Sequence, residues 1–304
     1  MRSRNVVLVA LATLALVLSV VAYSFSVPPP PGKVVSYEIV VREIESGNET
    51  VIAGGVEIAH FPRFLLDGSV VFDARAPAGE GLWRVIPGSD PVLLWEGGAG
   101  GLEPSPSPNG MEFVFNGPGI SLIVYNMSTA QFASFENLSP ATADLHPVFH
   151  PDGHRVLFTW SDNVADGWRP GYLGTLDVES GAVAVLLRIP EPPDTIRGAF
   201  FLPDGEHIVF DMDGLNLFDL RLGQTFRLTS WDDASFPRAS GSGNLVVLQT
   251  WAAPPAGPRT YGVDLYWLDS GRRVTVLSPT GPVQPWPDID ASGQRIVYVR
   301  GVLG

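Results

Sequence analysis

The chain has 304 residues, of which 45% are hydrophobic and 17% are charged, and its formal net charge is −13. This apolar content excludes an intrinsically disordered chain, because disorder requires low hydrophobicity. An acidic surface repels nucleic acid and anionic lipid headgroups, so we expect no nucleic-acid binding. The sequence has no cysteine, which excludes disulfides and thiol catalysis.

The first 27 residues predict a signal anchor or a signal peptide. Arg2 and Arg4 precede an uncharged apolar run over 6–22. Basic residues ahead of such a run stay on the cytoplasmic side, so the rest of the chain is expected outside. The run is longer than the core of a cleaved signal peptide, which favours a single-pass membrane anchor over secretion. The Pro-rich segment 28–33 then acts as a stiff spacer.

A short phrase recurs six times after residue 59. Its clearest copy is His146-Pro-Val-Phe-His-Pro-Asp-Gly153, in which a proline precedes a turn glycine by six residues. The turn glycines lie 42, 43, 52, 38 and 50 residues apart, and they are Gly68, Gly110, Gly153, Gly205, Gly243 and Gly293. A period of about 40–50 residues is typical of β-propeller blades.

Each repeat predicts four short strands. Proline is tolerated at the start of a strand, so it is expected to open the first one in every repeat except the fourth, which has Ala199 at this position. Glycine supplies the positive φ of the tight turn, and a β-branched and aromatic run such as 155–158 forms the second strand. A second hairpin follows, for example over 173–187. Four strands with turn signals between them make one propeller blade.

The two ends of the repeat region complete each other. The sixth repeat stops after its second strand, at residues 297–304, and a spare hairpin occupies 37–52. Pairing of these halves closes the ring and leaves only short sheet edges. The sequence therefore predicts an all-β, six-bladed propeller of four-stranded blades over 34–304, preceded by one N-terminal transmembrane or signal helix.

The repeat resembles that of the TolB-like propeller family. The resemblance rests on 146–153, on Phe201-Leu-Pro-Asp-Gly205 and on the junction 228–237. It implies a six-bladed propeller over nearly all of 34–304. The family's repeat is found in periplasmic transport components, peptidases and polysaccharide lyases, so the resemblance predicts a fold more firmly than an activity.

Candidate binding residues follow from the alignment of the six repeats. In propellers the innermost strands line the axis, and residues seven or eight before each turn glycine are expected at one mouth. From these we select His60, Glu103, His146, Arg197, Phe236 and Trp286. Aromatic rings, imidazoles and opposite charges suit the binding of a peptide or a polar ligand.

Other polar clusters predict no catalytic site, metal or cofactor. His146, His150 and His154 are evenly spaced, but they lie across a strand and its turn, so their side chains diverge. Asp288 and Asp290 are two residues apart on one strand and share a face. They are interpreted as a solvated or channel-lining pair and not as an acid/base pair.

The sequence favours a non-enzymatic, membrane-tethered scaffold outside the cytoplasm. We expect a monomeric ring that binds an envelope or membrane protein, or a surface glycan. The alternative is a metal-assisted polysaccharide lyase or hydrolase. That alternative requires His60, His146 and an acidic neighbour to converge within metal-bond reach.

Overall fold

The computed structural model describes residues 33–98, 101–118, 121–136, 138, 146–161, 171–188, 196, 198–253 and 259–304. The chain divides into a larger unit, Ser36–Gly301, and a smaller unit of Met1–Val35 with Val302–Gly304. In the described part of the smaller unit, the Gly304 N–H donates to the Lys33 carbonyl oxygen at 3.1 Å.

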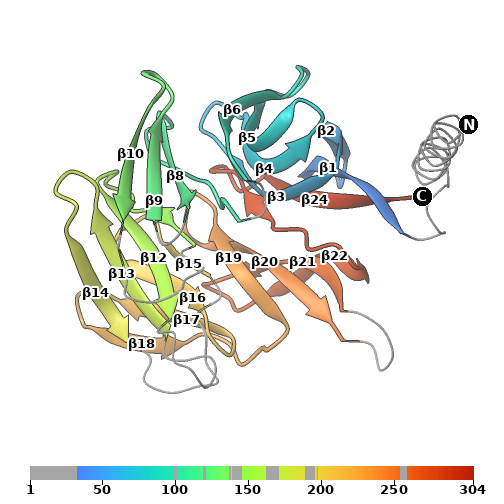
Figure 1. Ribbon diagram of the computed structural model, residues 1–304. Helices are drawn as coiled ribbons and strands as arrows, with labels where there is room; N and C mark the ends of the chain where they lie inside the picture. Colours follow the sequence, from blue (N-terminus) through green and yellow to red (C-terminus); the bar gives the residue numbers. More distant parts are fainter. Residues whose placement is uncertain are drawn as a thin grey trace, which may run out of the picture. The chain divides into compact units, whose positions relative to one another are not determined.

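The described part of the larger unit forms six four-stranded sheets, called blades 1 to 6 here (Figure 1). Blade 1 consists of β3 (Ile58–Phe64), β4 (Val70–Ala76), β5 (Gly79–Val85) and β6 (Val92–Glu96). Blade 2 consists of β7 (Ser105–Pro106), β8 (Glu112–Gly117), β9 (Ser121–Asn126) and β10 (Gln131–Glu136). Blade 3 consists of β11 (Val148–Phe149), β12 (Arg155–Ser161), β13 (Gly171–Asp177) and β14 (Val183–Arg188).

Blades 4 to 6 follow the same plan. Blade 4 consists of β15 (Ala199–Phe201), β16 (His207–Asp211), β17 (Leu215–Asp219) and β18 (Gln224–Arg227). Blade 5 consists of β19 (Ala234–Ala239), β20 (Leu245–Ala252), β21 (Thr260–Trp267) and β22 (Arg273–Gly281). Blade 6 combines β1 (Val34–Glu43) and β2 (Glu49–Val56) with β23 (Asp288–Ile289) and β24 (Arg295–Leu303).

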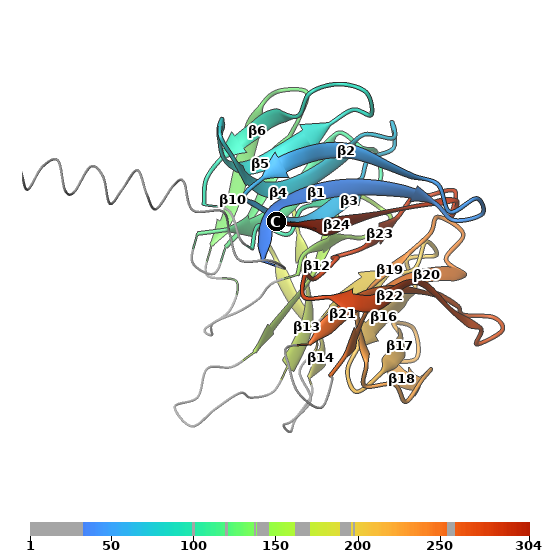
Figure 2. The same ribbon diagram turned by 90° about the vertical axis from the view of Figure 1, so that its right-hand side faces the viewer.

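The blades close into a ring around one axis. The innermost strands are β3, β7, β11, β15, β19 and β23, and each contacts the next, with β23 contacting β3. Figures 1 and 2 show the blades following one another around this centre in chain order. The prediction of a six-bladed all-β propeller with four-stranded blades is confirmed.

Blade 6 closes the ring as predicted from the two chain ends. Its strand order is β2-β1-β24-β23, so the C-terminal strand lies between the first strand and β23. The Tyr298 hydroxyl donates to Glu49 at 2.7 Å, and Arg300 pairs with Glu38 at 2.7 Å. These bonds join β24 to the N-terminal hairpin across the sheet.

The repeated phrase forms the same turn six times. The N–H of each turn glycine donates to the carbonyl oxygen three residues earlier, at 2.9 to 3.0 Å. Every one of these glycines has a φ between 68° and 79°. A residue with a Cβ rarely adopts this left-handed conformation, which explains the glycine in each copy.

The prediction that proline opens the innermost strand in five of the six blades needs a correction. It holds for β7, β11 and β23, but β3 and β19 begin four and three residues before Pro62 and Pro237. Pairing to the next strand shifts register between His60 and Arg63 in β3. The innermost strand is a sheet edge, so a proline at a bulge there interrupts little of the ladder.

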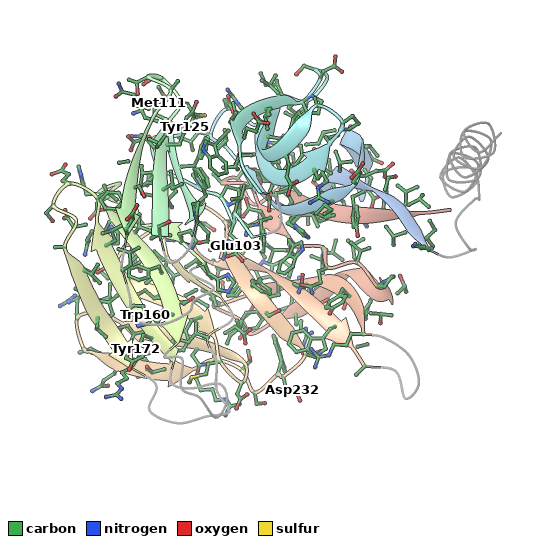
Figure 3. The ribbon with its side chains drawn as sticks, in the orientation of Figure 1. Glu103, Met111, Tyr125, Trp160, Tyr172 and Asp232 are labelled. Atoms are coloured by element: carbon green, nitrogen blue, oxygen red, sulfur yellow. The ribbon has the colours of Figure 1, made fainter. Side chains whose placement is uncertain are left out.

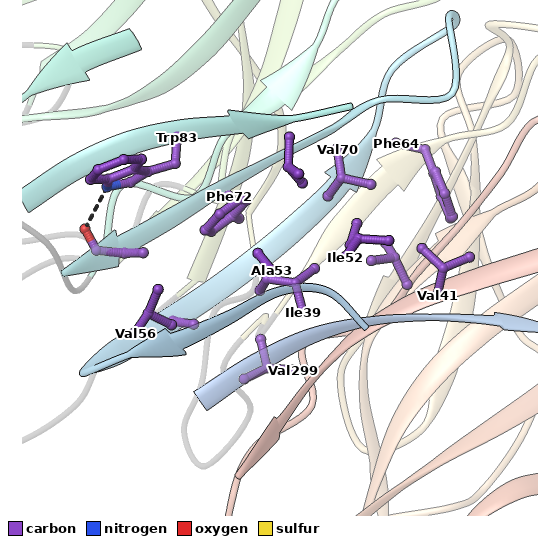
Figure 4. Close-up of a cluster of buried hydrophobic side chains, with 14 residues drawn as sticks. Ile39, Val41, Ile52, Ala53, Val56, Phe64, Val70, Phe72, Trp83 and Val299 are labelled. Carbon is purple, nitrogen blue, oxygen red and sulfur yellow. Dashed lines mark hydrogen bonds between the residues drawn. The ribbon is translucent and has the colours of Figure 1, made fainter. Parts of the chain in front are cut away.

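Apolar side chains fill the spaces between blades. The described residues form six buried clusters, and each joins two neighbouring blades. Figure 4 shows the cluster between blades 6 and 1, where Val299 lies near Ile39 and the Trp83 indole N–H donates to the Ala74 carbonyl oxygen at 3.2 Å. Burial between blades therefore holds the ring together.

The predicted N-terminal helix, and with it the signal anchor or signal peptide over 1–27, lies outside the described residues. Across the part of the chain that the structure describes, no helix is long and apolar enough to span a membrane.

Candidate functional site

A repeated backbone kink lies just before β7, β11 and β23 and within β3 and β19. Phe61, Glu103, His146, Phe236 and Trp286 each stand seven residues before a turn glycine, and their φ angles lie between 39° and 52°. This left-handed conformation costs a residue with a Cβ about 1 kcal/mol or more. Five blades thus place a side chain around the axis by the same strained backbone geometry.

Aromatic rings pack against one another at this end of the axis. The ring centroid of Trp286 lies 4.3 Å from that of Phe61 and 4.7 Å from that of Phe236. The imidazole of His146 lies 5.4 Å from the ring of Phe236, and that of His60 lies 6.1 Å from Trp286. We call these five residues the aromatic cluster.

The two histidines of the aromatic cluster face different carboxylates. His146 Nδ1 bonds to the Glu103 carboxylate, and both side chains are buried (Figure 3 labels Glu103). His60 Nδ1 lies 3.8 Å from a carboxylate oxygen of Asp73. Among the described residues, no group of three or more His, Asp or Glu side chains could hold a metal ion.

Five of the six residues predicted at the mouth therefore lie in one connected set. They are His60, Glu103, His146, Phe236 and Trp286, while Arg197 lies outside the described residues. The predicted divergence of the three evenly spaced histidines is also observed. His150 Nε2 lies 3.0 Å from the Gly205 carbonyl oxygen, and His154 Nδ1 lies 3.0 Å from Glu179.

A pocket of about 550 Å³ occupies the axis nearer the turn glycines. Its walls come from all six innermost strands. One residue from each blade, five positions before the turn glycine, lines it, and these are Arg63, Ser105, Val148, Phe200, Arg238 and Asp288. We call this space the axial pocket.

The axial pocket has a charged half and an apolar half. Blades 5, 6 and 1 contribute Arg238, Asp288 and Arg63, whereas blades 3 and 4 contribute Val148 and Phe200. Its rim includes Leu66, which is 67% exposed, and prolines of blades 2, 3 and 4. An apolar pocket with a few converging polar groups is the usual form of a ligand site.

The two arginines are buried. Arg63 is 3% exposed, and its Nη1 donates to the carbonyl oxygens of Pro62 at 2.9 Å and Trp286 at 3.4 Å. Its Nε is buried without a hydrogen-bond partner in the described structure. Arg238 is 9% exposed, and its Nη1 donates to the Pro237 carbonyl oxygen at 2.9 Å.

Neither guanidinium forms a salt bridge with a described carboxylate. Asp290 also lines the axial pocket, but it pairs with Arg295 at 3.0 Å. The Asp288 carboxylate accepts the Phe64 N–H at 2.9 Å. Asp288 is therefore the one carboxylate of the described lining without an arginine in direct contact, and Glu103, outside that lining, also attracts both guanidiniums. The predicted channel-lining position of Asp288 and Asp290 is observed.

Burial is the largest cause of the shifted pKa values of Arg63, Arg238 and Asp288. It lowers the pKa of Arg63, against the attraction of Asp288 and Glu103. Burial, and then the neighbouring charge of Arg63, lower the pKa of Arg238 to about 9. Burial also raises the pKa of Asp288, although Arg63 opposes the shift. Both arginines remain protonated at neutral pH, and their positive charge is energetically costly in this setting.

The sequence reasoning did not select Arg63 and Arg238 as functional residues. The sequence feature that identifies them is the residue type five positions before each turn glycine. In three consecutive blades around the ring, that position is occupied by a charged residue. Charge at a position that faces the axis indicates a binding role, because buried charge is otherwise avoided.

Comparison with known proteins identifies the fold. No protein-family model matches the sequence, and no curated protein does. A solved structure assigned as TolB from Agrobacterium tumefaciens is 18% identical, with a TM-score of 0.66, and the match covers 88% of this chain and 98% of that one.

Two oligogalacturonate lyase structures are also similar in fold. That from Vibrio parahaemolyticus is 11% identical, with a TM-score of 0.54, over 90% of this chain and 99% of that one. The other, in complex with manganese, is 12% identical, with a TM-score of 0.53, over 91% and 99%. The blade count, the repeated turn and these similarities agree: in its fold, the chain is a TolB-like six-bladed β-propeller.

Proposed function

We propose that the protein is a non-enzymatic binding module whose axial pocket receives part of an envelope or membrane protein. The observation that carries this proposal is the axial pocket itself, a space of about 550 Å³ lined by the same repeat position in all six blades. Its apolar walls and its charged half provide both affinity and orientation for one inserted segment.

The proposal includes a location outside the cytoplasm. The basic residues before the apolar run 6–22 support an N-terminal anchor with the propeller on the outer side. In this arrangement the propeller is held near the membrane, where proteins of the envelope are its neighbours. The N-terminal sequence is the support for this part of the proposal.

The ring end with the aromatic cluster is assigned a different role. Phe61, Glu103 and His146 are buried; the Phe61 ring packs against Trp286, and Glu103 bonds to His146. We assign this set to closing the axis structurally, and the axial pocket to ligand binding. This moves the proposed ligand from the predicted mouth to the opposite end of the innermost strands.

The test is affinity capture by the full chain from crosslinked membranes of its source. Leu66→Glu places a carboxylate on the apolar rim at a position that is 67% exposed, so the fold should tolerate it. Leu222→Glu is the matched control, because Leu222 is 60% exposed and lies in the turn between β17 and β18.

The expected result is one membrane protein captured by the wild type and by Leu222→Glu, and lost with Leu66→Glu. Equal capture by all three proteins would contradict binding at the axial pocket. Capture by none of them would contradict the scaffold role.

A further inference from the structure

Two guanidiniums line the axial pocket, and neither bonds directly to a described carboxylate. Arg63 belongs to blade 1 and Arg238 to blade 5, and blade 6 lies between them. Both guanidiniums act electrostatically on Asp288. Asp290 is engaged by Arg295, and Glu103 by His146. Asp288 and Glu103 attract both guanidiniums electrostatically, but neither carboxylate forms a described hydrogen bond or salt bridge with them.

A buried guanidinium without a directly bonded anion favours the binding of one. One hydrogen-bond donor of Arg63 is also unused, because its Nε is buried and has no hydrogen-bond partner in the described structure. Arginine offers its N–H groups as a planar fork, and that fork matches a carboxylate in two-point contact. A monoanion with two oxygens therefore supplies a negative charge in direct contact with the guanidiniums and acceptors for their free N–H groups.

The other wall of the axial pocket limits what carries this anion. Val148, Phe149, Phe200 and Phe201 line it, and all but Val148 are buried. The rim adds Leu66 and the prolines Pro108, Pro151 and Pro203. A sugar would leave its hydroxyl groups unpaired against these surfaces, whereas apolar side chains would lose little by burial there.

From these two halves we infer that the axial pocket binds the free C-terminal carboxylate of an apolar peptide segment, between Arg63 and Arg238. The apolar side chains of that segment lie against Val148, Phe200 and the rim. This inference rests on the proposed binding role of the axial pocket. It specifies the end of the partner that enters.

The experiment measures binding of small probes to the full chain in detergent by isothermal titration calorimetry, in a buffer free of other oxyanions. The first probe is the acetylated tetrapeptide Ala-Val-Ala-Phe with a free carboxylate. The same peptide with a C-terminal amide has equal apolar surface without the charge. Galacturonate carries a carboxylate on a polar ring, and inorganic phosphate is an oxyanion of higher charge.

The free-acid peptide is expected to bind about tenfold or more tightly than its amide, because charge-assisted hydrogen bonds to both arginines are lost in the amide. Galacturonate and phosphate are expected to bind more weakly than the free-acid peptide. Equal affinity of acid and amide would overturn the inference. Tighter binding of galacturonate or phosphate would overturn the peptide assignment.

Two variants test whether the free-acid peptide binds in the axial pocket. Arg238→Met should weaken the free-acid peptide about tenfold or more and leave the amide unchanged. Arg221→Met is the matched control, because Arg221 is exposed and faces Glu206. Unchanged affinity in Arg238→Met would overturn the inference. The wild-type comparison of acid and amide stands without any variant, so the inference remains testable should Arg238→Met fail to fold.

The experiments distinguish a failure of the proposed binding role of the axial pocket from a failure of the proposed carboxylate recognition. Loss of membrane-protein capture in Leu66→Glu, together with equal binding of acid and amide peptides, would retain the axial pocket as the site and reject the carboxylate. Membrane-protein capture that is unchanged by Leu66→Glu would reject the binding role of the axial pocket directly.

Discussion

Arg63 and Arg238 adopt the same arrangement in two blades that flank blade 6. Each lies five residues before its turn glycine, and each donates from Nη1 to the carbonyl oxygen of its own preceding proline at 2.9 Å. The sequence around them is the same, Phe-Pro-Arg, in both blades. The local bond holds each guanidinium at the axis without supplying a counter-charge.

Closure by blade 6 predicts that the C-terminal strand is indispensable. A chain that ends at Gln294 lacks β24, which lies between β1 and β23, so blade 6 cannot form. We expect loss of the cooperative thermal transition, because the buried clusters on both sides of blade 6 include β24 residues. Circular dichroism against temperature measures this.

The control for that truncation removes only residues 302–304. It leaves Val297 and Val299 in place and should melt within a few degrees of the full chain. A cooperative, native-like transition in the chain ending at Gln294 would contradict ring closure by blade 6.

The aromatic cluster predicts a stability cost for the loss of its central ring. Phe236 contacts Phe61, His146 and Trp286 while remaining partly exposed. We expect Phe236→Ala to lower the free energy of unfolding by about 2 kcal/mol, less than for a fully buried phenylalanine. Urea denaturation measures it.

Phe132→Ala is the comparison for that variant, because Phe132 is 63% exposed on β10. Its loss should change the free energy of unfolding by no more than about 0.5 kcal/mol. Similar values for the two variants would show that the rings at the axis do not act as a packed unit.

The turn aspartates predict a loss of stability in acid. Burial disfavours the ionised form of Asp152, but the His154 N–H and the Arg155 guanidinium outweigh it and lower its pKa to about 2. Ser69 lowers the pKa of Asp67 and His207 that of Asp204, in both cases against burial. Their stabilisation is present above the unfolded value of 3.8 and is lost as pH falls through the lowered folded pKa values.

Asp288 has the opposite effect on the pH dependence of stability. Burial raises its pKa, so its contribution is present below 3.8 and is lost as pH rises through the folded pKa. Glu49, Asp177 and Asp290 also have lowered pKa values, so six lowered carboxylates oppose one raised carboxylate. The free energy of unfolding should therefore fall between pH 4 and about 2. Asp152→Asn should lower stability at pH 7 and weaken that fall. An unchanged slope, measured by urea denaturation at each pH, would contradict the role of Asp152.

Much of the fold could be predicted because each turn needs its glycine. A φ near 70° at Gly153 and its five counterparts fixes one tight turn per blade, and the spacing then gives the number of blades. The proximity of some selected residues could also be predicted by counting back from the glycine: His146 and Phe236 contact each other although 90 residues separate them. Their proposed role in binding stays a prediction.

The axial pocket could not be predicted in the same way. Strand alternation assigns faces only along an unbroken strand, and the left-handed residues Phe61 and Phe236 interrupt it. The register of β3 shifts between His60 and Arg63 at this point. The direction of Arg63 and Arg238 therefore depends on a backbone kink that composition and period do not reveal.

The free energy of unfolding of Arg238→Met in ligand-free buffer, compared with that of the wild type, tests the proposed anion site most directly. A buried guanidinium that awaits an anion is costly in the empty protein. Its replacement by an apolar side chain should therefore leave stability unchanged or raise it by about 1–3 kcal/mol. A loss of about 3 kcal/mol or more is the result for a broken buried ion pair, and it would contradict a guanidinium that lacks a directly bonded anion at the axis.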